Sequence, residues 1–154
     1  MSSDSVKSYF ENLDLSDRIL SFEESVATVK LAAERIGCDM DRIAKSLAYN
    51  TSEGPVVVVM AGNVRTDRRM LKEKFGSDAE MVPADSLKEI IGHELGGVCP
   101  FLLNDGVNVF LDKSLESDGM LYLGAGDDRT IVSLTLEELG ELTDHKGWSD
   151  IGKR

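Results

Sequence analysis

The chain has 154 residues and a formal net charge of −11, with 42% hydrophobic and 29% charged residues, which is ordinary for a soluble globular protein. So acidic a chain is a poor candidate for a protein that coats DNA or RNA through a broad basic surface, although a grip on the end of a strand stays open. No apolar run approaches the ~20 residues that cross a bilayer, and the polar N-terminus resembles neither a secretory signal nor a transit peptide, so we expect a cytoplasmic protein without a membrane contact.

The first elements are a helix within residues 3–12 and a short strand at residues 18–20. Ser21 and Glu24 then have the spacing of a capping box, which predicts a second helix that starts there. Gly37 is placed to end this helix. Its inner face would carry Val26, Val29, Ala33 and Ile36.

The middle of the chain reads as two strands followed by a helix. Residues 43–49 alternate as a strand with Lys45 on its apolar face, and residues 56–61 form a strand buried on both faces. A turn between them is formed by Glu53, Gly54 and Pro55. Residues 67–75 then form a helix that Gly76 ends. The predicted apolar positions are Ile43, Leu47 and Tyr49 on the first strand and Met70, Leu71 and Phe75 on the helix.

The C-terminal half contains most of the remaining strands. A short helix at residues 84–91 ends at Gly92. Three strands follow, at residues 107–112, 120–123 and 130–134. Thr135 and Glu138 form a second capping box, which opens a final helix. Its inward positions are Leu136, Leu139 and Leu142.

The strands cluster late and do not alternate strictly with helices, which favours an α+β fold over a doubly wound α/β fold. A Rossmann fold is further disfavoured because no Gly-x-Gly-x-x-Gly follows the first strand. Without a repeat or a low-complexity linker, we expect a single domain over residues 1–154, with its core at about residues 18–144.

Basic residues gather in one short segment, which has two interpretations. The segment contains Arg65, Arg68, Arg69, Lys72 and Lys74. They form either a solvated helix face or a local phosphate-contact patch on an otherwise acidic body.

Lys45 interrupts an apolar strand. Such a lysine is either an edge residue that extends its amine to solvent or a cation directed into a pocket, where it binds a phosphate or another anion.

The glycine-rich stretch at residues 92–101 is neither helical nor strand-like. Glycines let a backbone approach a ligand and leave amides free to point at an oxyanion, while proline fixes the direction of exit. The stretch is therefore either a surface connection or a loop that stabilises an acyl-transfer transition state. Residues 123–128, Leu-Gly-Ala-Gly-Asp-Asp, form a second small-residue strand end with a weaker signal.

The usual nucleophiles and metal ligands are missing from the sequence. No Gly-x-Ser-x-Gly elbow is present. Cys38 and Cys99 are the only cysteines, and with two histidines at scattered spacings they form no zinc pattern. Cys99 lies near His93, but flanking valine and proline give it no activating environment. We expect no metal, no cofactor and no Cys–His nucleophile.

Taken in order, these segments resemble the YbaK/ProX family, the free-standing relatives of the editing domain inserted in bacterial prolyl-tRNA synthetases. The resemblance covers roughly residues 18–150. It is carried by residues 28–33, Ile36-Gly37, 43–47, 56–67, Gly92-His93, 96–101, 109–112 and 124–126.

The resemblance implies an editing-domain fold, in which a mixed and partly barrel-like sheet is flanked by helices. It implies hydrolysis of the ester between a mischarged amino acid and the terminal adenosine of a tRNA, with Lys45 as the functional lysine and Gly96, Gly97 and Pro100 in the catalytic Gly-x-x-x-Pro loop. Substrate-contact positions would be Val98, Cys99, Phe101, His93, Gly124, Gly126 and Arg65. The partners would be the 3′ end of a mischarged tRNA and, as a further candidate, an aminoacyl-tRNA synthetase; the oligomeric state stays open.

The family's hydrolysis is thought to be assisted by the free ribose hydroxyl beside the ester. Lys45 would hold the terminal phosphate or ribose, and the loop backbone would orient the carbonyl and the water. Pocket size would exclude larger cognate side chains, which favours a small Ser-, Thr-, Ala- or Cys-type substrate, with the Ser/Thr subgroup nearest in pattern. Residues 100–103 read Pro-Phe-Leu-Leu, where many relatives continue Pro-Phe-Gly-Leu. A non-catalytic binding module for aminoacyl-tRNA or a synthetase, and a hydrolase of simple amino-acid esters, remain the alternatives.

Overall fold

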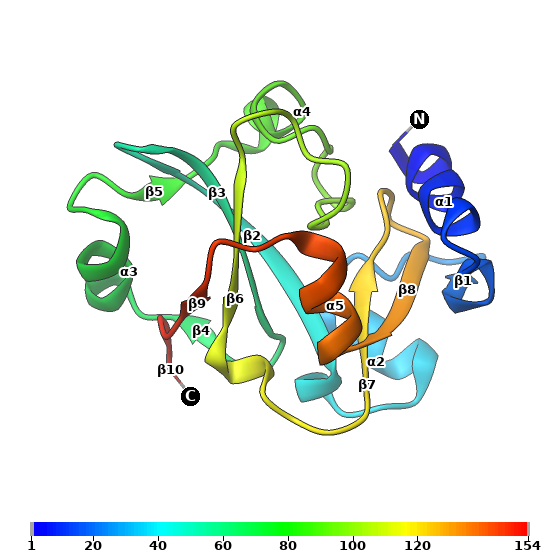
Figure 1. Ribbon diagram of the computed structural model, residues 1–154. Coiled ribbons are helices and arrows are strands. Elements are labelled where there is room, and N and C mark those ends of the chain that lie inside the picture. Colours follow the sequence, from blue (N-terminus) through cyan, green and yellow to red (C-terminus); the bar gives the residue numbers. More distant parts are fainter. Residues whose placement is uncertain (1, 154) are drawn as a thin grey trace.

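The computed structural model describes residues 2–153, and Figure 1 shows the arrangement of their helices and strands. The helices are α1 (Ser2–Asn12), α2 (Val29–Ile36), α3 (Arg68–Phe75), α4 (Leu87–Ile90) and α5 (Leu136–Thr143). The strands are β1 (Ile19–Ser21), β2 (Ile43–Thr51), β3 (Gly54–Ala61), β4 (Arg65–Thr66), β5 (Glu80–Met81), β6 (Asn108–Asp112), β7 (Met120–Gly124), β8 (Thr130–Thr135), β9 (Trp148–Ser149) and β10 (Gly152–Lys153). Short 3-10 turns lie at Ser16–Arg18, Met40–Arg42, Ala84–Ser86 and Lys113–Leu115.

One mixed sheet organises the chain, with the strand order β1-β8-β7-β2-β3-β6-β9 and with β5 paired to β2. The β2–β3 hairpin is antiparallel over its whole length, whereas β7 runs parallel to β2 and β6 runs parallel to β3. A separate two-stranded sheet joins β10 to β4. The predicted α+β class with a mixed sheet and flanking helices is confirmed.

Strand β3 is the centre of the packing, and the prediction that it is buried on both faces is confirmed. Val57 and Val59 are fully buried in the main core, which also contains Phe10 of α1 and Leu139 of α5. Val58, on the opposite face, belongs to a second cluster that includes Leu71 of α3. Burial of one such side chain contributes about 1.5–3 kcal/mol. The sheet therefore has an apolar layer on each side.

The start of the second helix was predicted wrongly. Helix α2 begins at Val29, and its N-cap is Thr28, whose side chain accepts a hydrogen bond from the Leu31 amide. The residues before it are extended instead, since the amides of Phe22 and Val26 donate to carbonyls of residues 129 and 128. Glu24 forms an ion pair with Arg35 in place of a capping box at Ser21. A long-range backbone pairing thus overrides a local capping signal.

Other helix boundaries follow the local signals. Asp67 caps α3 by accepting from the amides of Arg69 and Met70, and Gly37 ends α2 with a φ of 83°. The predicted helix at residues 84–91 is shorter, with a 3-10 turn before α4. The predicted turn is also displaced, because Gly54 and Pro55 already pair with β2 as the first residues of β3. Strands β4, β5, β9 and β10, with two residues each, were not predicted.

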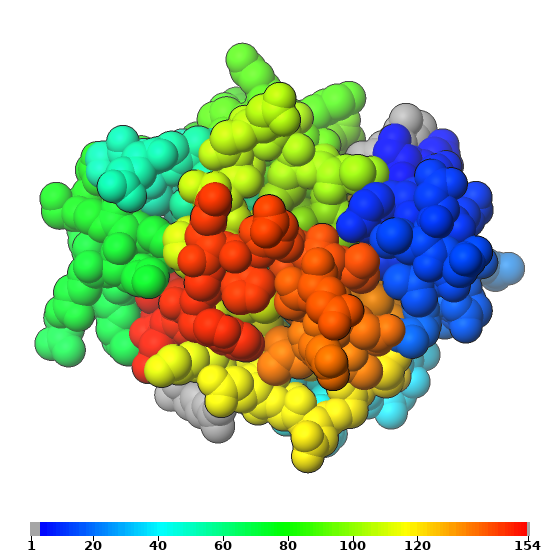
Figure 2. Space-filling model, in the orientation of Figure 1, coloured from blue at the N-terminus to red at the C-terminus, as the bar shows by residue number. Residues whose placement is uncertain are grey.

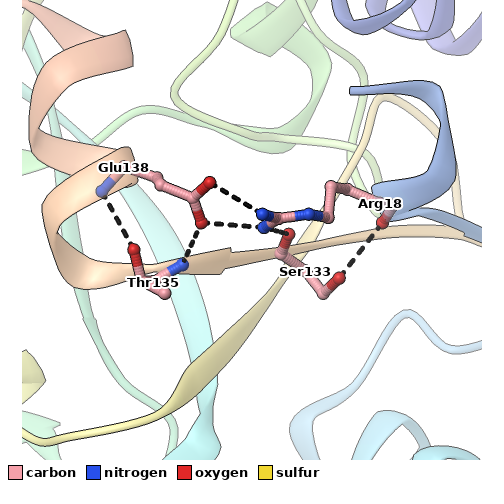
Figure 3. Close-up of polar contacts among 4 residues, drawn as sticks. All are labelled: Arg18, Ser133, Thr135 and Glu138. Atoms are coloured by element: carbon pink, nitrogen blue, oxygen red, sulfur yellow. Dashed lines mark hydrogen bonds and ion pairs between the residues drawn. The ribbon is translucent and has the colours of Figure 1, made fainter. Parts of the chain in front are cut away.

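The predicted capping box at the start of α5 is present and is extended by an ion pair from the other end of the chain (Figure 3). The Glu138 amide donates to Thr135 Oγ1 over 3.2 Å, and the Thr135 amide donates to Glu138 Oε1 over 2.9 Å. Arg18 then donates to both Glu138 carboxylate oxygens, over 2.7 and 2.9 Å. The hydrogen bond from Arg18 is the main cause that lowers the pKa of Glu138. This pair ties the segment before β1 to α5.

In the space-filling view, α5 and the chain that follows it cross one face of the molecule, between α3 on one side and α1 on the other (Figure 2). No helix among residues 2–153 is long and apolar enough to span a membrane.

We predict that Glu138→Gln lowers the free energy of unfolding by about 1 kcal/mol at pH 7, because it keeps an acceptor for the cap but loses the charged pair with Arg18. The lowered pKa of Glu138 means that this contribution is present above the unfolded value near 4.5 and disappears as the pH falls through the folded value. Urea unfolding at pH 7 and at pH 3 measures both, with Glu137→Gln as the exposed control. An equal loss at the two pH values would rule out the charged pair as the cause.

Candidate functional site

A cavity of about 550 Å³ opens beside β2, within the size range of small-molecule sites. Its origin is the pairing of β2. One edge of this strand pairs with β7 only at Ile43 and Ala44, and with β5 only at Tyr49 and Asn50. The stretch between these contacts, which begins at Lys45, lines the cavity.

The other walls come from segments far apart in the sequence. Val26, Thr28 and Ala32 line the cavity from the start of α2, and Gly124, Thr130 and Ile131 line it from β7 and β8. Further walls are Val82, Pro83, Leu87 and Leu95. The lining is therefore mainly small and aliphatic, with a few hydroxyl groups.

Lys45 is the cation of this cavity. Its side chain is half-buried, and its Nζ donates a hydrogen bond to the Val64 carbonyl. Burial, and secondarily the charge of Arg65, lowers the pKa of Lys45. An ammonium group has three donors, so the bond to Val64 leaves two for an anion or a ribose hydroxyl.

The glycine-rich loop reaches the same cavity through Gly96 and Val98, so the structure brings Lys45 and this loop together. Gly96 has a φ of 89°, which a side chain rarely adopts. Gly97 faces the neighbouring strand end, because a Cβ at this position would lie 2.5 Å from the Gly126 carbonyl oxygen. Loop and strand end therefore touch backbone to backbone, and only glycine fits at residue 97.

His93, Cys99 and Phe101 lie behind the loop and are not among the residues that line the cavity. All three are buried, with exposed fractions of 2% or less. His93 Nε2 lies 2.6 Å from the Phe101 carbonyl oxygen and 3.4 Å from Cys99 Sγ, while its Nδ1 has no partner among residues 2–153. Since Nε2 and the thiol both approach the Phe101 oxygen, this cluster holds the exit of the loop.

The environment of Cys99 opposes nucleophilic chemistry. Burial raises the pKa of its thiol to about 12, so the thiol is protonated at neutral pH. The proximity of His93 therefore does not generate a thiolate. Among residues 2–153, no group of three or more His, Cys, Asp or Glu side chains is arranged to hold a metal ion.

The remaining predicted site residues occupy different positions. Gly124 lines the cavity, Gly126 supports Gly97, and Pro100 is buried at the end of the loop. Arg65 is exposed on β4, outside the lining but close enough to influence Lys45. The functional roles of these residues stay predictions.

Several cavity walls were not recognised in the sequence, above all the segment at residues 81–84, Met-Val-Pro-Ala. Its only signal is an apolar run between two predicted helices. Nothing local indicates that the Val82 amide donates to the Ala48 carbonyl, over 3.0 Å, and so brings this run to β2.

Leu102 stands where the Pro-Phe-Gly-Leu pattern has glycine, and it adopts a φ of 52°. The left-handed backbone suited to glycine is therefore kept, with a side chain added. Leu102 does not line the Lys45 cavity but a separate shallow groove beside α1, together with Tyr9. The departure from the pattern changes this groove and not the cavity wall.

Comparison with known proteins gives consistent relatives. The family model described as the aminoacyl-tRNA editing domain matches residues 23–142. The uncharacterized protein YwhH of Bacillus subtilis (strain 168) is 37% identical over 99% of this chain and 98% of its own length. The proline–tRNA ligase of Streptococcus sanguinis (strain SK36) is 26% identical over 66% of this chain, but the match spans only 17% of the ligase. A solved structure of a proposed trans-editing enzyme for prolyl-tRNA synthetase shares the fold, with a TM-score of 0.88 at 23% identity over 99% of this chain and 98% of that one.

We predict that Gly97→Ala and Gly124→Ala separate sharply in stability. A Cβ at residue 97 collides with the backbone of Gly126, which should cost about 1–3 kcal/mol, whereas a Cβ at residue 124 meets its nearest atom at an ordinary 3.7 Å. Chemical denaturation of both variants measures the difference. Equal stability would show that the loop and the strand end are not in contact.

We also predict that iodoacetamide does not label Cys99 in the folded protein at pH 8, because the thiol is buried and protonated. The half-buried Cys38 serves as the internal comparison, and urea-unfolded protein as the positive control. Mass spectrometry of the labelled peptides gives the result, and rapid native labelling of Cys99 would contradict the assigned environment.

Proposed function

The chain belongs to the aminoacyl-tRNA editing domain family, and on this premise we propose that it hydrolyses the ester between a wrongly attached amino acid and the 3′ end of a transfer RNA, acting in trans in the cytoplasm. The observation that carries the proposal is the cavity in which Lys45 and Gly96 meet. An aminoacyl ester is already activated, so its hydrolysis depends on positioning and charge stabilisation more than on a strong protein nucleophile.

Lys45 holds the substrate in this scheme. Its position at the edge of the cavity suits contact with the phosphate or the ribose of the terminal nucleotide, and its bond to the Val64 carbonyl fixes the direction of the amine. A substrate held at this end presents its ester further inside, towards the loop.

The loop backbone provides the donor groups. The Gly97 amide is occupied by the Glu94 carbonyl, over 3.0 Å, whereas residues 2–153 offer the Gly96 amide no backbone acceptor. The Gly96 amide is therefore available to the developing oxyanion, and the ribose hydroxyl next to the ester assists the attacking water. With Cys99 protonated and buried, the water attacks the ester directly and no acyl-enzyme forms.

The cavity walls favour a small acyl group. Ala32 and Val26 limit its size, and Thr130 adds a hydroxyl group beside the aliphatic surface. This combination suits amino acids of Ser, Thr, Ala or Cys type and excludes larger cognate side chains by their volume.

We predict that Lys45→Ala lowers the deacylation rate at least about a hundredfold, because an ester displaced by about 1 Å loses its alignment. The free energy of unfolding should change by less than about 1 kcal/mol, as for most substitutions outside the core. Lys146→Ala removes a lysine from an exposed position and is the matched control. Single-turnover hydrolysis of one mischarged tRNA measures all three proteins.

Cys99→Ala is predicted to retain turnover, since its thiol does not line the cavity. The substitution enlarges the space behind the loop and is expected to alter selectivity between acyl groups more than rate. An inactive Cys99→Ala together with an active Lys45→Ala would overturn the mechanism.

A deacylation screen of the purified protein against a panel of mischarged tRNAs tests the activity itself. Hydrolysis of one or a few small aminoacyl-tRNAs is the expected result. Tight binding without hydrolysis of any of them would identify a binding module, and equal activity on simple amino-acid esters would identify a small-molecule hydrolase.

A further inference from the structure

The C-terminal end of the chain folds back onto the turn that supports Lys45. Strand β10 pairs antiparallel with β4, so that Lys153 lies directly opposite Arg65 (Figure 1). The residue before Arg65 is Val64, whose carbonyl accepts the Lys45 hydrogen bond. The family model ends at residue 142, so β10 lies outside the matched region.

The tail is anchored in the core. The buried Asp112 carboxylate accepts hydrogen bonds from Ser149 Oγ and from the Ile151 amide, each over 2.9 Å. The Asp67 amide donates to the Ile151 carbonyl over 2.7 Å. Gly152 packs so closely on Val64 that a Cβ there would collide with it. These contacts fix the position of Lys153 relative to β4.

This arrangement collects positive charge on an acidic protein. Side chains opposite each other in an antiparallel pair share a face, and two like charges in such positions repel each other. Arg65 and Lys153 are both exposed, and neither they nor Lys45 form an ion pair with an acidic residue among residues 2–153.

The nearby carboxylates do not neutralise this charge. Asp112 is buried and satisfied by the tail, and an oxygen of Asp67 accepts from the first amides of α3. Asp150 is exposed, without an ion pair to Arg65 or Lys153. The repulsion between the two cations is thus available to be relieved by an anionic ligand.

We propose that Arg65 and Lys153 bind phosphodiester groups of a single-stranded nucleic acid whose 3′ end enters the Lys45 cavity. This inference rests on the proposed function and extends it to the nucleotides before the terminal one. An exposed pair of cations that leads away from a cavity fits successive phosphates of a strand, because a backbone carries one charge per nucleotide along its length. The C-terminal tail is then part of the binding surface.

The test measures binding of a fluorescein-labelled six-nucleotide single-stranded RNA by anisotropy at several salt concentrations. Arg65→Gln and Lys153→Gln should each weaken binding several-fold and reduce the log–log salt slope by about 0.7, the value for one phosphate contact on a single strand. Lys146→Gln removes one charge from an exposed position outside β4 and β10 and should leave both quantities unchanged. Unaltered binding in the first two variants, or an equal loss in the third, would overturn the proposal.

Two further arms separate the possible outcomes. Inorganic phosphate at millimolar concentration should compete poorly, and full displacement of the RNA by it would identify a free-phosphate site instead of a strand site. With mischarged tRNA, the Arg65 and Lys153 variants should raise KM at unchanged kcat, while aminoacyl-adenosine, which has no phosphate, should be hydrolysed as by the wild type. RNA binding is measured without turnover, so an inactive wild type would refute the proposed function and leave this test decisive.

Discussion

Strand β2 is paired with β3 along its entire length but has neighbours on its other edge only near its two ends. Because the Ile43 carbonyl accepts from Gly62 next to β3, alternation directs the backbone groups of Ser46 to the opposite, open edge. Buried backbone groups need hydrogen-bond partners. A gap at the centre of a sheet is therefore sustained by access to water or to a ligand, and the cavity provides this access. The position of Lys45 at the start of the gap follows from the same break in pairing.

The loop that closes the cavity is fixed from behind. Gly97 rests on the backbone of Gly126, and the buried cluster of His93 and Cys99 converges on the Phe101 carbonyl. A loop held in this way presents its remaining amides in a set direction before any substrate arrives. Such preorganisation is the main means by which a site without a nucleophile stabilises an oxyanion. It also explains why a cysteine beside a histidine here is structural, since the same burial that fixes the loop keeps the thiol protonated.

Local sequence signals identified what local interactions decide. Asp67, Thr135 and Glu138 mark helix ends because their side chains bond amides within three residues, and the valines of β3 mark a buried strand. The false helix start at Ser21 fails for the opposite reason, because residues 22–27 are held by carbonyls a hundred positions away. The walls at residues 81–84 and the tail at β10 share this difficulty: short segments gain their place only from distant partners. Lys45 and the glycine loop stood out because a cation in an apolar strand and clustered glycines are unusual in themselves.

The central claim is that the ester is held between Lys45 and the loop that contains Gly96. The most direct measurement is the structure of the protein bound to an adenosine that carries serine or alanine through a 3′ amide, which resists hydrolysis. The account predicts that the acyl group occupies the cavity, with its carbonyl oxygen directed at the Gly96 amide and the nucleoside next to Lys45. An analogue bound elsewhere, such as in the groove beside α1, or one bound with its acyl group pointing out to solvent, would contradict it.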